Sequence, residues 1–251
     1  MDICRELEMF DDFCIETNVD IAFVLDVSSG MEPILSLVRN TSWYEIIKDI
    51  FCVQQRRKIE TLRFKVIWYS DLRSCCDDSG YGESKFFVMP HEEQDFYQFL
   101  NNLHTTTCAE KTSGLEALER AMDADWNQSG DKIRHIICLF TDKSAYPLDL
   151  SAKLNGKNGD VCWNKEQHSE DIPQDLRGLF DKWEAYGSRN GIEKCTKLSV
   201  TGRRLLLFAP STYPWIYMER ELIYVYRWDV ALGQGGREIH DDDICSIFCS
   251  H

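Results

Sequence analysis

The residues whose types and spacing could do chemistry follow the first apolar run of the chain. Residues 19–25 (VDIAFVL) are mostly apolar, and Asp26 and the turn VSSG (27–30) come directly after them. Asp26, Ser28 and Ser29 would place one carboxylate and two hydroxyls on a tight turn. Hard oxygen ligands of this kind, together with water, suit Mg²⁺ in octahedral geometry, or Mn²⁺. We therefore interpret this turn as a candidate metal site.

Two later segments could complete that site. Asp142 comes just after the apolar run 133–140 (IRHIICLF) and would add a second carboxylate. The loop TTTC at 105–108 precedes a helix expected from about residue 113, and Thr107 of this loop could add a hydroxyl. A plainer interpretation stays open for all of these residues, because Asp, Ser and Thr after a strand also cap helices and form turns.

The elements that must position these residues are strands alternating with helices. Apolar runs predict strands over 19–25, 62–69, 133–140, 204–209 and 222–228, with a short strand at 85–89 that lies at an edge or runs antiparallel. Apolar stripes at spacings of three and four predict helices over 34–51, 92–103, 113–125, 173–186 and 241–248. Within the first of these helices, Ser42 and Glu45 could form a capping box from which the helix restarts.

This alternation predicts an α/β fold: a Rossmann-like, doubly wound, mostly parallel central sheet with helices on both faces. We expect a single domain over residues 1–251. Ligands of such sheets bind at the carboxyl ends of the strands, and Asp26 and Asp142 both follow strands directly. The two carboxylates are therefore expected within a few ångströms of each other.

The same segments resemble the von Willebrand factor A (vWA) family over roughly residues 19–230. The resemblance rests on the turn DVSSG at 26–30, the LFTD pattern that ends at Asp142, and the helix start TSGLEAL at 112–118. The family's metal-ion-dependent adhesion site uses a DxSxS motif after the first strand, a Thr from a middle loop and an Asp after the fourth strand.

By that resemblance, Asp26 and Ser28 match the first two motif positions and Asp142 matches the late Asp. Gly30 stands at the third motif position, with Ser29 beside it, and Thr107 matches the middle-loop Thr only with a shift. The resemblance implies a vWA-like module that binds Mg²⁺ or Mn²⁺ and holds a protein partner, whose carboxylate fills the open position on the metal. Intracellular members of the family commonly work with AAA+ ATPases or in stress and defence assemblies, which implies an adaptor role.

Two other functions remain open from the sequence. A Mg²⁺- or Mn²⁺-dependent hydrolase or phosphotransferase could use the same carboxylates on the same scaffold. No glycine-rich phosphate-binding loop of the P-loop or dinucleotide type accompanies them, which disfavours that class. A structural scaffold with a degenerate metal site is the third hypothesis.

A long polar stretch at about 143–172 follows Asp142 and has neither helical nor strand periodicity. Loops longer than about 12–15 residues without structure of their own are usually functional or disordered. We predict that this insertion borders the metal face and helps to choose the partner, with Tyr146 and Trp163 as contacts, since large aromatic residues are enriched among interface hot spots. The alternative is an insertion with no such role.

The composition narrows the class of partner. With 28 basic and 42 acidic residues the net charge is −14, which disfavours nucleic acid because such binders need a basic footprint. The first residues lack the basic start and apolar run of a signal peptide, and no apolar stretch approaches 18 residues, so we expect a cytoplasmic protein that does not cross a membrane. The eleven cysteines are then mostly reduced thiols.

Overall fold

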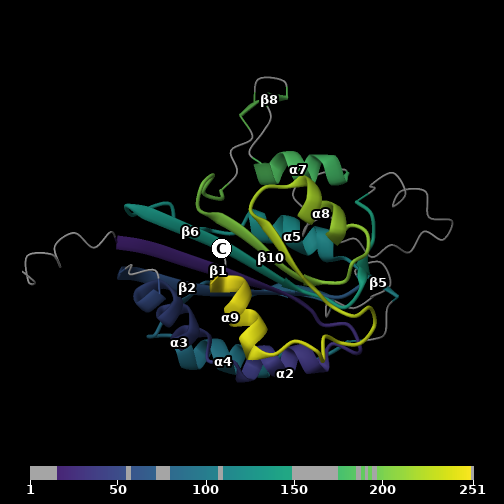
Figure 1. Ribbon diagram of the computed structural model, residues 1–251, viewed down its shortest axis with the longest axis horizontal. Coiled ribbons are helices and arrows are strands. Elements are labelled where there is room, and N and C mark those ends of the chain that lie inside the picture. The colour runs from purple at the N-terminus through teal and green to yellow at the C-terminus, as the bar shows by residue number, and fades with distance from the viewer. Residues whose placement is uncertain are drawn as a thin grey trace, which may run out of the picture.

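The computed structural model describes residues 16–54, 58–71, 80–106, 110–148, 175–184, 188–189, 192–193 and 197–249. These form a central twisted sheet with helices on both faces (Figure 1). The strands are β1 Glu16–Asp26, β2 Lys58–Tyr69, β3 Tyr81–Glu83, β4 Phe87–Met89, β5 Lys111–Thr112, β6 Lys132–Phe140, β7 Ser144–Ala145, β8 Ser188–Arg189, β9 Ile192–Glu193, β10 Arg203–Ala209 and β11 Val225–Asp229. The helices are α2 Glu32–Asn40, α3 Trp43–Lys48, the π-helical turn η2 Asp49–Gln54, α4 Glu93–Asn101, α5 Gly114–Met122, α7 Leu176–Glu184, α8 Trp215–Glu221 and α9 Asp241–Cys249.

The main sheet has the strand order β11-β10-β6-β1-β2-β3, and β4 also pairs with β2. The pairs β11–β10, β10–β6, β6–β1 and β1–β2 are all parallel, whereas β3 and β4 run antiparallel to β2. The prediction of an α/β fold with a central, mostly parallel sheet flanked by helices is confirmed. The antiparallel strand expected at 85–89 is also present, as β4.

Strand β1 lies in the middle of this sheet and is buried on both faces. Ile21, Phe23 and Leu25 pack into the core on one face, while Ala22 and Val24 pack into the core on the other. Successive side chains of a strand point to opposite faces, so a strand covered by helices on both sides reads as a continuous apolar run. This burial fixes the position of Asp26, the last residue of the strand.

The two faces are covered by different helices. Helices α2, α3, α4 and α9 pack on one face, where Trp43 is fully buried and its ring lies 4.6 Å from that of Phe23. Helices α5, α7 and α8 pack on the other face, with Trp183 and Trp215 fully buried. Figure 1 shows these two groups below and above the sheet. Full burial of each large apolar side chain contributes roughly 1.5–3 kcal/mol.

The helix predicted over 34–51 is interrupted, and the expected capping box does not form. Helix α2 ends at Asn40 and α3 begins at Trp43, but Ser42 makes no side-chain hydrogen bond to the helix. The backbone N–H of Trp43 instead donates to the hydroxyl of Tyr97 from α4, at 3.1 Å. A tertiary contact has therefore replaced the local cap that the sequence indicated.

The strand predicted over 222–228 begins only at Val225, because residues 222–224 form a turn. Tyr224 has a φ of 61°, in the left-handed region, which a strand does not use. Before this turn lies α8, which the periodicity analysis did not predict. The final helix, predicted at 241–248, is confirmed as α9. In the part of the chain that the structure describes, none of the helices combines the length and the apolar character needed to cross a membrane.

Candidate functional site

The turn after β1 folds around the Asp26 carboxylate. Asp26 is fully buried, and its Oδ1 accepts a hydrogen bond of 2.8 Å from the backbone N–H of Ser28. The turn closes with the N–H of Met31 donating to the carbonyl of Ser28 at 3.1 Å. Gly30 within it has a φ of 102°, which favours glycine. The VSSG segment is therefore a tight turn, as its residue types indicate.

Neighbouring elements bring two threonine hydroxyls to the same carboxylate. Leu25 of β1 pairs with Phe140 of the parallel strand β6, so the loops after both strands leave the sheet side by side. Thr141 then donates to Asp26 Oδ2 at 2.7 Å. Thr112, from β5, donates to the same oxygen at 3.2 Å. Both oxygens of Asp26 are thus held by donors from three separate segments.

Asp142 is held by a glycine-rich loop that precedes α9. Its Oδ2 accepts a 2.7 Å hydrogen bond from the N–H of Gly235, and its backbone carbonyl accepts one of 2.9 Å from the N–H of Gly233. Gly235 also packs closely on the turn after β1, because a Cβ added to it would lie 2.1 Å from the carbonyl oxygen of Gly30. The loop over 231–237 therefore fixes the Asp142 side chain next to the Asp26 turn.

Lys143 directs a buried ammonium into this cluster. Its Nζ donates to the backbone carbonyl of Ser29 at 3.0 Å and lies 3.5 Å from Asp142 Oδ1. Its side chain is only 9% exposed. Two carboxylates and one ammonium, all buried, leave the site with one net negative charge.

Burial dominates the electrostatics of the site. Loss of solvent raises the pKa of Asp26, while hydrogen bonds from Ser28 and Thr141 and the charge of Lys143 oppose that rise. Burial likewise raises the pKa of the Tyr69 hydroxyl well above its usual value, and the nearby Asp26 carboxylate adds to the effect. A buried carboxylate in such surroundings gains from any further cation placed beside it.

Two buried oxygen atoms of the site lack a hydrogen bond from any described residue, although the Lys143 ammonium lies 3.5 Å from one of them, Asp142 Oδ1. Among the described residues, neither Ser28 Oγ nor Asp142 Oδ1 has a hydrogen-bond partner of normal geometry, although the Ser28 hydroxyl lies close enough to Asp26 to lower its pKa. Buried polar atoms are otherwise nearly always paired. Carboxylate and hydroxyl oxygens are what Mg²⁺ and Mn²⁺ take as ligands, so the donor set fits such an ion. Within the described ranges, no three His, Cys, Asp or Glu side chains gather at one point, so hydroxyls would have to complete the set.

Exposed apolar side chains border this end of the sheet. Leu232, which precedes the Gly233 that binds Asp142, is 58% exposed. Tyr213 is 43% exposed and Tyr217 is 51% exposed, with their rings 5.8 Å apart. Thr212, the residue before Tyr213, is tied to the loop after β6 by a 3.0 Å hydrogen bond from Ser144. We call Leu232, Tyr213 and Tyr217 the apolar rim of the site.

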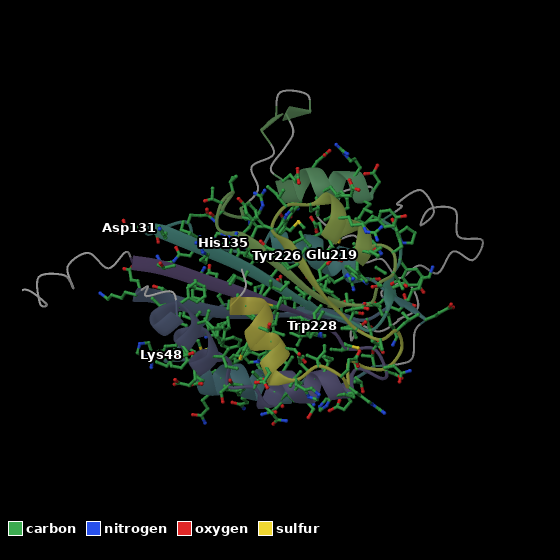
Figure 2. All side chains as sticks on the ribbon, in the orientation of Figure 1. Lys48, Asp131, His135, Glu219, Tyr226 and Trp228 are labelled. Atoms are coloured by element: carbon green, nitrogen blue, oxygen red, sulfur yellow. The ribbon has the colours of Figure 1, made fainter. Side chains whose placement is uncertain are left out.

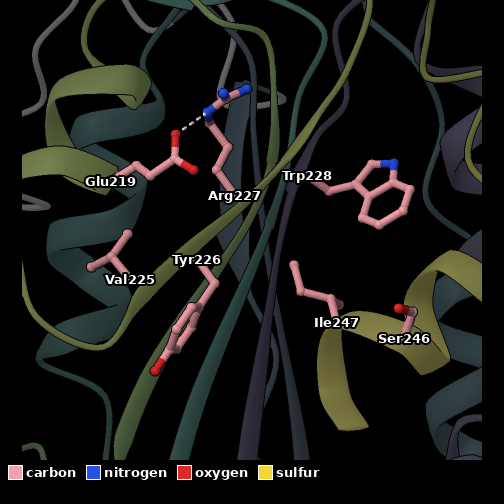
Figure 3. A pocket seen from close by; sticks show the side chains of 7 residues that line it. All are labelled: Glu219, Val225, Tyr226, Arg227, Trp228, Ser246 and Ile247. Carbon is pink, nitrogen blue, oxygen red and sulfur yellow. Dashed lines mark hydrogen bonds and ion pairs between the residues drawn. The ribbon is translucent and has the colours of Figure 1, made fainter. Parts of the chain in front are cut away.

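A separate pocket of about 240 Å³ lies at the β11 edge of the sheet. Figure 3 shows its lining side chains, which are Glu219, Val225, Tyr226, Arg227, Trp228, Ser246 and Ile247. Its charged groups neutralise one another, because Arg227 forms ion pairs with Glu219 at 2.8 Å and with Asp229 at 2.7 Å. The pocket therefore lacks the unpaired buried oxygens that distinguish the site at Asp26.

Comparison with known proteins gives only weak structural likenesses. No family model matches the chain, and a search of curated proteins finds no match. Among solved structures, the chain is similar to the pilus adhesin SpaC from Lactobacillus rhamnosus GG (18% identity, TM-score 0.37, 51% of this chain and 15% of that one). It is also similar to proximal thread matrix protein 1 from the mussel byssus (14% identity, TM-score 0.44, 94% and 47%) and to the PilB minor pilin from Streptococcus sanguinis (11% identity, TM-score 0.45, 93% and 62%). The chain spans less than two thirds of each of these structures. Likenesses this weak assign neither a fold family nor a function.

Of the residues predicted for the metal site, Asp26, Ser28 and Asp142 lie in one cluster. Ser29 contributes its backbone carbonyl, which accepts the hydrogen bond from Lys143. Thr107 lies outside the described residues, and the threonine that reaches Asp26 from that part of the chain is Thr112.

Of the predicted partner contacts, Tyr146 lies beside β5 and is half-buried. Its N–H donates to the carbonyl of Thr112 at 2.9 Å, and its hydroxyl donates to Asp71 at 3.3 Å. Trp163 and residues 149–172 of the predicted insertion lie outside the described residues.

Sequence reasoning missed Lys143 and the loop at 231–237. Because Lys143 directly follows Asp142, the sequence places it near the site, but the sequence does not show the direction of its side chain. The run GQGG at 233–236 indicated a turn, because consecutive glycines favour left-handed backbone, yet nothing in it pointed to Asp142.

Proposed function

We propose that this chain is a vWA-like protein-interaction module that binds Mg²⁺ or Mn²⁺ at the carboxyl edge of its sheet and, through that ion, a carboxylate of a protein partner. One observation carries the proposal: Ser28 Oγ and Asp142 Oδ1 are buried beside Asp26 and accept no hydrogen bond from any described residue. A hard cation placed between these atoms would satisfy both and would stabilise the buried Asp26 carboxylate. The resemblance of the DVSSG and LFTD segments to the vWA family supports the same assignment.

The surroundings of the site favour binding over catalysis. Both oxygens of Asp26 accept hydrogen bonds from fixed donors, an arrangement that holds a carboxylate in place rather than freeing it to move a proton. The apolar rim formed by Leu232, Tyr213 and Tyr217 adds exposed area of the kind that protein interfaces bury, with Tyr enriched at their centres. A charged site bordered by apolar side chains suits a protein partner that offers an acidic group.

The test is a titration of the purified, chelator-treated protein with MgCl₂ and MnCl₂, followed by calorimetry and by thermal unfolding. We expect saturable binding that raises the midpoint of unfolding. By linkage, the free energy of unfolding should rise by about 2.7 kcal/mol at a metal concentration a hundred times the dissociation constant. Ser28→Ala is the sharpest variant, because Ser28 Oγ is the proposed ligand that carries no charge and accepts no hydrogen bond from a described residue. Without metal this variant should lose some stability, because the Ser28 hydroxyl favours the buried Asp26 carboxylate. It should bind the ion at least tenfold more weakly.

Asp26→Asn should abolish the response, because it removes the central charge. The matched control is Asp131→Asn, which makes the same change at an exposed position just before β6, at the opposite end of the sheet (Figure 2). It should titrate like the wild type. A metal response that survives Asp26→Asn, or that Ser28→Ala leaves unchanged, would rule out this site as the metal centre.

A further inference from the structure

Hydrogen bonds hold the backbone of Lys143, and its side chain points into the site. Its N–H donates to Thr141 Oγ1 at 3.1 Å, and its carbonyl accepts a 2.8 Å hydrogen bond from the indole N–H of the fully buried Trp215. Strand β7 then begins at Ser144 and pairs with β5. With both backbone groups held, the four-carbon stem of Lys143 is the part of the residue that can move.

The ammonium of Lys143 occupies the place where a cation is needed. It contacts the carbonyl of Ser29 from the turn after β1 and Asp142 Oδ1 from the loop after β6, and so bridges the two loops that would supply metal ligands. One of these contacts, Asp142 Oδ1, is also one of the two oxygen atoms that the proposed metal would take. A divalent ion and this ammonium would then compete for a single oxygen, and at that separation they would repel each other strongly in a buried site.

We propose that the Lys143 ammonium is the resident cation of this site, and that a divalent ion binds only when the ammonium swings out. This inference rests on the proposed function, because it concerns the same ion at the same site. The ammonium neutralises one of the two carboxylates and keeps the loops together without metal. The lysine therefore sets the metal affinity of the site low.

The test compares divalent-ion affinities of the wild type and Lys143→Met by calorimetry with MgCl₂ and MnCl₂. Methionine keeps an unbranched stem of similar length and removes the charge. We expect the variant to bind at least tenfold more tightly, whereas Lys143→Arg, which keeps the charge, should bind no more tightly than the wild type.

Lys65→Met is the matched control, because the Lys65 side chain is also 9% exposed and pairs with Glu83 on the outermost strand β3, and not with a residue of the site. It changes the net charge equally and should leave metal affinity unchanged. Equal affinities in the wild type and Lys143→Met, or weaker binding by the variant, would overturn the role of Lys143 while leaving the metal site standing. If neither protein binds a divalent ion, the proposed function fails and this inference fails with it.

A second measurement uses the wild-type protein alone and therefore does not depend on how a variant folds. Amine-reactive labelling is followed at Lys143 and Lys65 by mass spectrometry, with and without saturating Mg²⁺. Displacement of the ammonium should raise labelling at Lys143 at least severalfold and leave Lys65 unchanged. Labelling at Lys143 that stays constant or falls when Mg²⁺ binds would show that the ammonium remains in the site.

Discussion

Asp26 is the residue around which the candidate site is organised. Its carboxylate is fully buried, which raises its pKa, and hydrogen bonds from Ser28 and Thr141 with the charge of Lys143 only partly offset the loss of solvent. Burying a charge is costly unless it is paired and hydrogen-bonded. The compensating charge is that of Lys143, which opposes the rise in the pKa of Asp26.

A substitution at Gly235 tests how closely the loop over 231–237 must approach the turn after β1. Its φ is +69°, and a Cβ there would lie 2.1 Å from the carbonyl oxygen of Gly30, so Gly235→Ala must push two loops of the site apart. Gly233 is the matched control: its φ is +71°, but a Cβ would meet no described atom within 4 Å. We expect Gly233→Ala to cost about 1–2 kcal/mol from left-handed strain alone.

Gly235→Ala should cost clearly more than this in urea unfolding, and it should also weaken Mg²⁺ binding, because the Gly235 N–H holds Asp142 Oδ2. Equal losses of stability in the two variants would mean that the contact with Gly30 does not constrain the site.

At the scale of elements, the sequence predicted the helices and strands whose apolar pattern reflects which of their faces are buried. The β1 run is apolar because helices cover both faces of the sheet. Helix α5 was predicted from the apolar stripe of Leu115, Leu118 and Met122, although the structure buries nearly all of its residues. Helix α8 was missed, because its seven residues are too few to display a period. The start of α3 was assigned to a local capping box, whereas the N–H of Trp43 donates to the hydroxyl of Tyr97 from another helix.

The site was predictable only where its residues directly follow the ends of strands. Asp26 and Asp142 were found because parallel strands bring such residues to one edge. Thr112 reaches Asp26 across 86 positions of sequence, through the two-residue strand β5, which has no sequence pattern of its own. Lys143 would ordinarily extend into solvent, and its inward direction depends on Trp215 and Ser29, neither of which is near it in sequence.

A largely buried cluster of charged side chains joins helices α5 and α7, on the face of the sheet opposite α2. Lys182 of α7 lies 2.7 Å from Glu119 and 2.6 Å from Asp123, and the Glu119 side chain is only 1% exposed. Burial raises the pKa of Glu119, and the charge of Lys182 opposes the rise. Lys182→Met would leave a buried carboxylate without its cation, which typically costs about 3–5 kcal/mol.

The double variant Lys182→Met with Glu119→Gln should recover part of that loss, because the unpaired charge is gone. Lys48→Met is the control, since Lys48 makes a 4.0 Å surface pair with Glu45 and should change stability little (Figure 2). Urea unfolding measures all three. A double variant no more stable than Lys182→Met alone would show that the unpaired Glu119 charge is not the cause of the loss.

At the scale of the whole molecule, 28 basic and 42 acidic residues give a net charge of −14. Repulsion among the excess negative charges destabilises the folded state. The candidate site adds to this locally, with two carboxylates against one ammonium. Any cation will therefore stabilise the protein to some extent by screening, whether or not it enters the site. The proposed function depends on separating this general effect from specific binding.

The two effects differ in their concentration dependence and in their response to substitution. NaCl screens charges over a Debye length of about 10 Å at 0.1 M, so it should raise the unfolding midpoint gradually and equally in the wild type, Asp26→Asn and Lys143→Met. MgCl₂ at matched ionic strength should add a saturating increase in the wild type, a larger one in Lys143→Met and none in Asp26→Asn. For a domain of this size, each kcal/mol of binding free energy appears as about 2–4 °C in a thermal melt. If MgCl₂ and NaCl at equal ionic strength give superimposable curves for the wild type and Lys143→Met, the divalent ion acts only by screening, and the site at Asp26 holds no metal.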